Sequence, residues 1–146
     1  MSRTSKNLAA WQVLSRSHRR LQAHLETALK DADLPGLDVL DVLTALEDSR
    51  EDLTAKALEE QLLMPQYGVS RLLDRMEKDA QIRRIADTHD KRLKHIHLTD
   101  TGRTTHMAMV KTRDAALEGF LSLRAKPGQL DRMADLLARL DRGSTD

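Results

Sequence analysis

The amino-acid sequence predicts a mainly α-helical fold with one small β-hairpin. Apolar residues recur at spacings of three and four along most of the chain, the pattern of helices with one buried face, and only three prolines interrupt it. Two segments, at about residues 82–86 and 93–98, instead have the pattern of short strands, and the charged loop DTHDKR joins them. Helices on both sides of a single hairpin are therefore expected.

Composition excludes several functional classes. A chain of 146 residues favours a single domain with room for a core. The absence of cysteine excludes a disulfide framework, a thiolate zinc site and a thiol nucleophile. No apolar run approaches the length of a membrane span, and no amino-terminal signal pattern is present. We therefore expect a cytoplasmic protein that does not bind membranes.

Charge is unevenly distributed, although the net charge is only +1. Residues 1–30 carry a net charge of +5, residues 31–64 of −8, residues 65–103 of +3 and residues 104–146 of +1. The near-neutral total hides an acidic segment followed by a basic one. The basic segment contains the predicted hairpin, so this part of the chain is the better candidate for contact with a polyanion.

The first third of the chain predicts a long helix and then a short one. Between residues 7 and 30 a single apolar stripe is formed by Leu8, Trp11, Leu14, Leu21, Leu25 and Leu29. The sequence DLPG at residues 33–36 ends this helix, because proline disfavours helix in the residue before it. Apolar residues between positions 37 and 46 predict a second helix that ends near Asp48.

The central third predicts two further helices before the hairpin. Leu53 is compatible with a short strand, and Thr54 can cap a third helix. Pro65 suits the first turn of a fourth helix. The buried face of that fourth helix is predicted from the i, i+3, i+4, i+7 spacing of Val69, Leu72, Leu73 and Met76.

After the hairpin the sequence predicts two more helices. Thr99 is placed to cap a helix that runs to about Arg124, and KPG then breaks the chain. A final helix has an apolar stripe of Leu130, Met133, Leu136, Leu137 and Leu140. A helix-turn-helix followed by a hairpin is the winged-helix arrangement. The long terminal helices expose stripes that the central module cannot cover, so we expect them to form the dimerisation region of a homodimer.

The polar face of the fourth helix is the first functional signal. It combines residue types that read base edges in a major groove, at positions Gln66, Tyr67, Ser70, Arg71, Asp74 and Arg75. Gly68 destabilises a helix by about 1 kcal/mol relative to alanine, so its presence suggests close approach to a phosphate backbone. An ordinary solvated helix face is the alternative explanation, and the helix alone does not decide between them.

The hairpin loop shifts the balance toward nucleic acid. Asp90 and Arg92 are two residues apart, so in extended chain their side chains project to the same side. A carboxylate beside an arginine fixes the direction of the guanidinium, which a narrow minor groove attracts. Lys91 and Lys94 can add phosphate contacts. A charged loop with an incidental ion pair remains the alternative.

These segments together resemble the multiple-antibiotic-resistance regulator (MarR) family of winged-helix transcription factors. The resemblance rests on VSRLLDRMEKD, IRR, DKR and HLTDTGR in this order, and on LPGLDVLDVLTALE at residues 34–47. It places the family's aspartate-x-arginine wing pair at Asp90 and Arg92. Two positions depart from the family pattern: Ala80 replaces a usual glycine, which predicts a strained turn, and Leu93 replaces a frequent small residue.

The resemblance implies one MarR-like domain over residues 1–146. A winged helix-turn-helix lobe would span residues 34–103, and dimerisation helices would span residues 7–33 and 104–142. The family's members are typically homodimers that bind a pseudo-palindromic operator in double-stranded DNA, usually as repressors. A small effector, often an aromatic or phenolic acid, typically binds between the two regions and causes release of the DNA. The resemblance implies no cofactor.

Histidines and the single tryptophan have competing explanations. His95 and His97 share one face of the second strand, so the two could bind a metal together with His89 or Asp87. The spacing matches no strong metal motif, so solvent-facing histidines near phosphate are the preferred interpretation and no metal is expected. Trp11 and His18 are candidate ligand-pocket residues, although dimer packing explains Trp11 better.

An enzyme is not expected. The sequence has no nucleophile elbow, phosphate loop or zinc-protease helix. The stronger competitor is a helical dimer of the same fold that acts through protein-protein interaction without binding an operator. Binding to DNA upstream of the protein's own gene distinguishes these two hypotheses.

Overall fold

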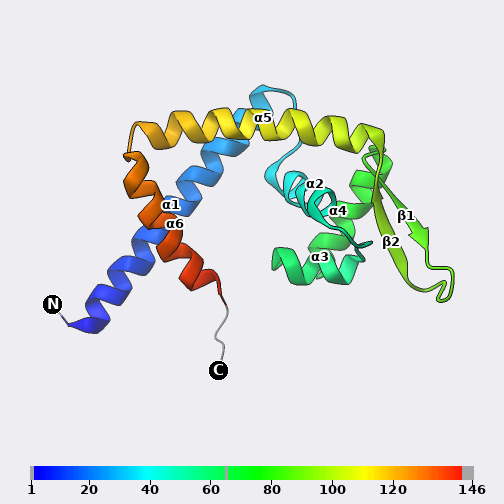
Figure 1. Cartoon of the computed structure of the whole chain (residues 1–146), viewed down its shortest axis with the longest axis horizontal. Helices are drawn as coiled ribbons and strands as arrows, with labels where there is room; N and C mark the ends of the chain where they lie inside the picture. The colour runs from blue at the N-terminus through cyan, green and yellow to red at the C-terminus, as the bar shows by residue number, and fades with distance from the viewer. Residues whose placement is uncertain (1, 65, 143–146) are drawn as a thin grey trace.

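The computed structural model describes residues 2–64 and 66–142, with the side chains of Gln66 and Tyr67 excepted. The described residues form six helices and one antiparallel hairpin (Figure 1). The elements are α1 (Arg3–Asp31), α2 (Leu37–Asp48), α3 (Ala55–Leu62), α4 (Gln66–Lys78), β1 (Ile82–Ala86), β2 (Lys94–Leu98), α5 (Asp100–Ser122) and α6 (Pro127–Asp141). The order predicted from the sequence is confirmed. Pro65 lies outside the described residues.

A compact lobe is built from α2, α3, α4 and the hairpin, below the amino-terminal half of α5 (Figure 1). The predicted inner face of α4 is confirmed, because Val69, Leu72, Leu73 and Met76 are all buried. They pack in one core with Leu40 and Leu43 of α2, Leu58 of α3, Ile82 and Ile96 of the hairpin and Met109 of α5. The lobe therefore carries its own hydrophobic core.

The hairpin is joined to that core at its base. Its register pairs Ile82 with Leu98 and Ala86 with Lys94. Leu53 contributes one isolated bridge to β2, in which the Ile96 amide donates to the Leu53 carbonyl over 2.8 Å. The far end of the hairpin extends away from the lobe (Figure 1), and the side-chain hydrogen bonds of its loop join residues of the hairpin to one another.

The end of α4 and the start of α5 form one joint. Ala80 has a φ of +59°, and the amides of Ala80 and Gln81 donate to the carbonyls of Glu77 and Met76 over 3.0 and 2.9 Å. This is the Schellman pattern of a helix end. Glycine adopts the left-handed conformation without strain, whereas a residue with a Cβ is disfavoured there by roughly 1–2 kcal/mol. Ala80 thus supplies the strained turn that the sequence predicts.

The start of α5 docks on this turn. The Thr99 hydroxyl donates to the Ala80 carbonyl and accepts the Gly102 amide at 3.0 Å, so Thr99 is the predicted cap. The Thr99 amide donates to the Gln81 carbonyl over 3.2 Å. A Cβ at Gly102 would lie 2.1 Å from that same carbonyl oxygen, so the contact between the two helix ends requires glycine at this position.

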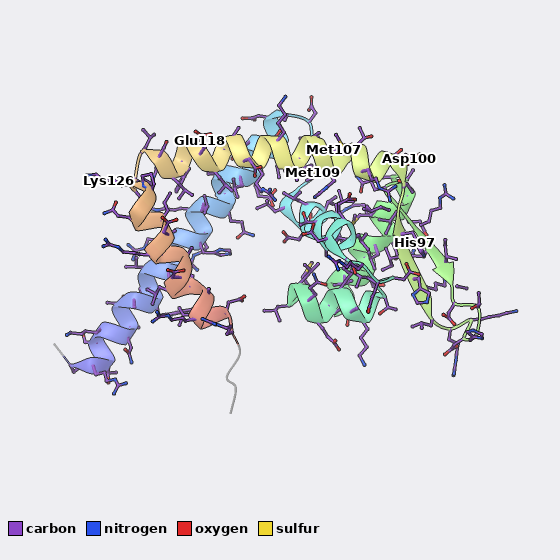
Figure 2. All side chains as sticks on the ribbon, viewed as in Figure 1. His97, Asp100, Met107, Met109, Glu118 and Lys126 are labelled. Carbon is purple, nitrogen blue, oxygen red and sulfur yellow. The ribbon has the colours of Figure 1, made fainter. Side chains whose placement is uncertain are left out.

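The long α5 connects the lobe to a second region made of α1 and α6. Figure 2 labels Met109 and Met107, two residues apart on α5; Met109 is fully buried and Met107 is exposed, so α5 buries one face only. Beyond the lobe, Leu8, Trp11 and Leu14 of α1 are exposed, and none of the described residues of α6 is buried. None of the described helices is long and apolar enough to cross a membrane.

Replacing Ala80 with glycine should stabilise the protein. The variant Ala80→Gly relieves the left-handed strain, and after the larger backbone entropy of glycine in the unfolded chain the expected gain in unfolding free energy is about 1 kcal/mol. Ala108→Gly, at an exposed position in the middle of α5, is the matched control and should lose about 1 kcal/mol. Chemical denaturation at one fixed protein concentration measures both, and a loss for Ala80→Gly would contradict the strain.

Candidate nucleic-acid interface

The outer face of α4 presents polar side chains to solvent. Ser70, Arg71, Asp74 and Arg75 are exposed, as the helical periodicity predicts from the buried residues between them. Gln66 and Tyr67 form the first turn of this helix, but their side chains lie outside the described part of the structure. The candidate reading surface is therefore the exposed side of α4, opposite its buried residues Val69, Leu72, Leu73 and Met76.

Gly68 sits on α4 without any internal contact that requires glycine. A Cβ built at this position would meet no atom within 4 Å, and the residue has no positive φ. Packing inside the chain, as far as the structure describes it, does not explain why a helix-destabilising residue stands here. A surface approached closely by another molecule would explain it.

Two of the predicted α4 residues are engaged by other side chains of the protein. Arg75 Nη2 lies 2.9 Å from Asp38 Oδ2 of α2. Asp74 Oδ1 lies 2.7 Å from Arg84 Nη2 of β1. Among the described residues, no carboxylate lies within ion-pair distance of Arg71. Within the described part of the chain, Arg71 and Lys78 are therefore the α4 cations without a carboxylate partner.

Arg84 is fixed by two carboxylates of α4. Glu77 Oε1 is 2.9 Å from Arg84 Nη2, and Glu77 Oε2 accepts the Arg84 amide at 3.0 Å. The hydrogen bonds from Arg84 hold the pKa of Glu77 below its usual range. Arg84 was not among the residues predicted to form the interface, although its two-residue spacing from the buried Ile82 on a strand could have placed it on the face turned toward the lobe.

The wing loop brings Asp90 and Arg92 together. Arg92 Nε lies 3.3 Å from Asp90 Oδ1, which also accepts the Arg92 amide at 3.0 Å. The two residues lie in a turn closed by the Leu93 amide and the Asp90 carbonyl, 3.0 Å apart, and not in extended chain as expected; the turn achieves the pairing instead. The Arg92 side chain is 93% exposed, so the guanidinium projects from the tip of the hairpin.

A groove of about 270 Å³ lies between α4 and the wing. Apolar atoms of Leu73, Leu93 and Ile96 line its inside, and its polar lining residues include four cations: Lys56, Arg84, Arg92 and Lys94. Lys56, two residues after the Thr54 cap of α3, was not predicted to lie in this groove, because no sequence spacing relates it to α4 or the wing. The groove concentrates positive charge on the side of the lobe that carries Ser70 and Arg92.

The strand histidines, expected to face solvent, are partly exposed, with 23% of the His95 side chain and 38% of the His97 side chain accessible. Each lies beside a carboxylate: His95 Nε2 is 2.9 Å from Asp87 Oδ1, and His97 Nδ1 is 3.8 Å from Asp52 Oδ1. Among the described residues, no three metal-binding side chains converge. Each histidine therefore has one acidic neighbour, a smaller set than a metal site needs.

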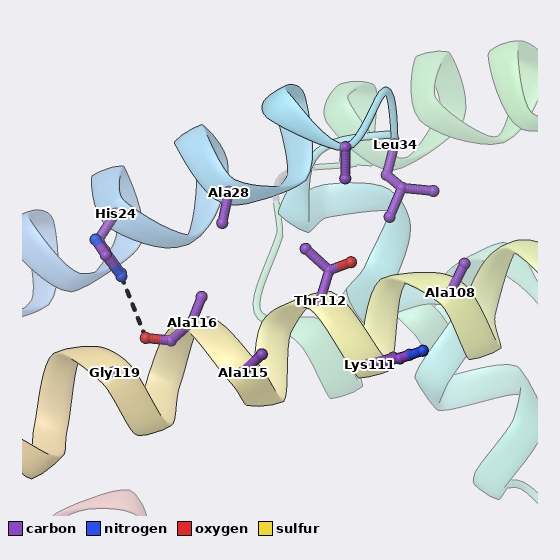
Figure 3. Close-up of a pocket in the computed structure, with 10 residues that line it drawn as sticks. His24, Ala28, Leu34, Ala108, Lys111, Thr112, Ala115, Ala116 and Gly119 are labelled. Carbon is purple, nitrogen blue, oxygen red and sulfur yellow. Dashed lines mark hydrogen bonds between the residues drawn. The ribbon is translucent and has the colours of Figure 1, made fainter.

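A separate cavity of about 870 Å³ lies between α1 and α5 (Figure 3). Alanines form half of its lining residues, and the others are Leu34, Thr112, Lys111, His24 and Gly119. His24 Nε2 donates to the Ala116 carbonyl over 3.2 Å across one end (Figure 3). Trp11 and His18, the predicted pocket residues, are exposed earlier on α1 and do not line this cavity.

Comparison with known proteins gives one family match. Residues 32–93 match the model of the MarR family. Among curated protein sequences no match was found. Solved structures match over nearly the whole chain: AbsC, a MarR family transcriptional regulator from Streptomyces coelicolor, has a TM-score of 0.80 at 20% identity and covers 97% of this chain, with 94% of its own chain covered.

Two further structures of the same fold were solved with bound molecules. Sco3205, a MarR family transcriptional regulator from Streptomyces coelicolor in complex with DNA, has a TM-score of 0.81 at 23% identity, with 100% of this chain and 92% of its own covered. CouR from Rhodococcus jostii RHA1, bound to p-coumaroyl-CoA, has a TM-score of 0.77 at 20% identity, with 92% of each chain covered. At these identities the likeness establishes the fold.

Proposed function

We propose that this chain is a winged-helix regulator of the MarR family, a homodimeric, sequence-specific regulator of transcription that binds double-stranded DNA. The match of residues 32–93 to the MarR family model and the shared fold support this proposal. The observation that carries this proposal is that the outer face of α4 and the exposed Arg92 belong to one lobe, with a cation-lined groove between them. A recognition helix and a wing arranged in this way can enter adjacent grooves of one duplex.

The two contact elements have different tasks in this proposal. Base edges in the major groove are read by α4, through Gln66, Tyr67, Ser70 and Arg71. Gly68 lets this helix approach a phosphate closely. From the wing, Asp90 directs Arg92 toward the minor groove, where a narrow groove attracts a guanidinium. Lys91 and Lys94 contact phosphates, which gives affinity without sequence preference.

Dimerisation is proposed through the two ends of the chain. The exposed apolar residues of α1 and α6, among them Trp11, Leu14, Leu136 and Leu140, form surface that a single chain does not cover and that a second copy can bury. We assign dimerisation to residues 7–33 and 104–142 and DNA binding to the lobe of residues 34–103, within one domain of residues 1–146. Two-fold symmetry then matches a pseudo-palindromic operator.

We further propose that the protein is a repressor released by a small aromatic or phenolic effector. The cavity between α1 and α5 supports this, because its apolar wall suits a flat ring and Lys111 can pair with an acid group. CouR, which has the same fold, was crystallised with p-coumaroyl-CoA. In this chain the cavity also touches Leu34, just before α2, so a ligand there contacts both regions.

Specific binding to DNA upstream of its own gene tests the proposal. In a mobility-shift assay the wild-type protein should bind that DNA more tightly than a random duplex, and Arg92→Ala should bind it more weakly because the minor-groove contact is lost. Equal and weak binding of both proteins to both duplexes would refute the regulator hypothesis. The alternative, a dimer of this fold that acts only on other proteins, would then be the better explanation.

Arg71 and Lys94 should give different signatures when truncated. Arg71→Ala should lose on the order of 1–3 kcal/mol of binding free energy and relax sequence preference at one base pair. Lys94→Ala should weaken binding similarly on all sequences and reduce the dependence of affinity on salt. Titrations at several salt concentrations on operator and mismatched duplexes measure both, and equal salt slopes for wild type and Lys94→Ala would remove Lys94 from the phosphate contacts.

Filling the cavity should block effector response and leave DNA binding intact. Ala116→Trp places a large ring in the space lined by Ala28 and Thr112, so benzoate, hydroxybenzoate and cinnamate derivatives that release wild-type protein from DNA should no longer do so. Met107→Trp, at an exposed α5 position outside the cavity lining, is the control and should respond as wild type does. An unchanged response of Ala116→Trp would place the effector elsewhere.

A further inference from the structure

The wing loop is organised around one carboxylate that the DNA contacts do not use. Asp87 Oδ2 accepts the amides of His89 and Asp90 at 2.8 and 2.9 Å. Its other oxygen, Oδ1, accepts Nε2 of His95 from β2 at 2.9 Å. The side chains of Asp87 and His95 are each only 23% exposed. One side chain thus binds both the start of the loop and the opposite strand.

These bonds set the backbone path to Arg92. The Asp87 amide donates to the Leu93 carbonyl over 2.8 Å, which closes residues 87–93 into one loop. Within the loop, the Asp90 amide is held by Asp87, and the Asp90 carboxylate then accepts the Arg92 amide. The Arg92 side chain is 93% exposed, so packing does not hold it. Its position is set by this series of hydrogen bonds along the loop backbone.

The bond between Asp87 and His95 has a definite direction. Hydrogen bonds from His95 and from the two loop amides lower the pKa of Asp87 to about 2. The carboxylate is therefore ionised at neutral pH and only accepts hydrogen bonds, so His95 Nε2 carries the proton. The other ring nitrogen, Nδ1, is buried without a hydrogen-bond partner among the described residues, which leaves Asp87 as the group that fixes the ring.

We propose that Asp87 and His95 are positioning residues that hold the wing loop in the shape that presents Arg92 to DNA. This inference rests on the proposed function and adds residues that touch no DNA. A loop ordered before binding loses less conformational entropy when it binds, so the pair raises the affinity that the Arg92 contact contributes. Leu53, Ile82 and Ile96 anchor the hairpin base independently, so the pair governs the tip of the hairpin rather than the fold.

For Asp87→Ala, electrostatics alone and the positioning role predict changes of opposite sign in the affinity for DNA. Asp87→Ala removes a negative charge from a surface that binds a polyanion, and this alone would strengthen binding. The positioning role instead predicts a roughly tenfold loss of affinity for operator DNA, the size of one misplaced specific contact. His95→Leu should show a similar loss. His95→Gln, whose side-chain amide can donate to Asp87, should keep most of the affinity.

A double-mutant cycle shows whether the effect passes through Arg92. In an Arg92→Ala background, Asp87→Ala and His95→Leu should cause no further loss, since the residue they position is already absent. Thr88→Ala, at an exposed position of the same loop, is the control and should change little in either background. Equal losses in both backgrounds, or no loss in the wild-type background, would overturn the inference.

A measurement without DNA separates this inference from the proposed function. Amide hydrogen exchange of residues 87–93 in the full-length free protein should accelerate in Asp87→Ala and His95→Leu and stay near wild type in His95→Gln. Exchange of the α4 amides should not change in any of them. Unchanged loop exchange in Asp87→Ala would refute the inference even if the protein binds its operator. If the wild-type protein does not bind an operator but loop exchange accelerates in Asp87→Ala, the regulatory role would be refuted, and the ordering of the loop by Asp87 and His95 would still hold.

Discussion

The end of α4 and the start of α5 meet in a close backbone contact that fixes how the lobe joins the long helices. Thr99 binds the carbonyls of Ala80 and Gln81, and Gly102 allows α5 to approach the Gln81 carbonyl more closely than any side chain would permit. The outer helix of the lobe and the long helix that leaves it therefore meet through backbone atoms, which have little freedom to move. The direction of α5, and with it the placement of α1 and α6, follows from this joint.

Carboxylates also connect α1 to the lobe, through α2 and α4. Glu26 of α1 accepts the Leu37 amide at 3.0 Å and so caps α2, whose own cap residue is glycine. Asp38 then holds Arg75 of α4. Burial raises the pKa of Asp41, and the neighbouring charges of Asp38 and Glu26 raise it further. The acidic segment of the sequence thus has basic partners from later in the chain, with Arg75 beside Asp38 and Arg103 beside Glu47.

The sequence was sufficient for the elements and insufficient for the contacts that join them. Apolar spacing located the buried face of α4, and a threonine before a polar turn located the start of α5. The left-handed residues Asp33 and Leu63 were not anticipated, because neither is glycine. The sequence did not indicate that His95 and His97 each lie beside one carboxylate, because Asp87 comes from the start of the hairpin loop and Asp52 from a distant turn.

Carboxylates on the candidate DNA-binding side determine which cations remain available to a phosphate. Asp38, Asp74 and Glu77 hold Arg75 and Arg84 against the protein, and a cation already paired gains less from a further anion because it must first give up its partner. Arg92 differs, since its contact with Asp90 is longer, at 3.3 Å, and its side chain is almost wholly exposed. Asp90 therefore directs Arg92 without neutralising it, and Asp87 fixes Asp90 in turn. In the basic segment, Asp87 and Asp90 therefore orient the outward-facing Arg92.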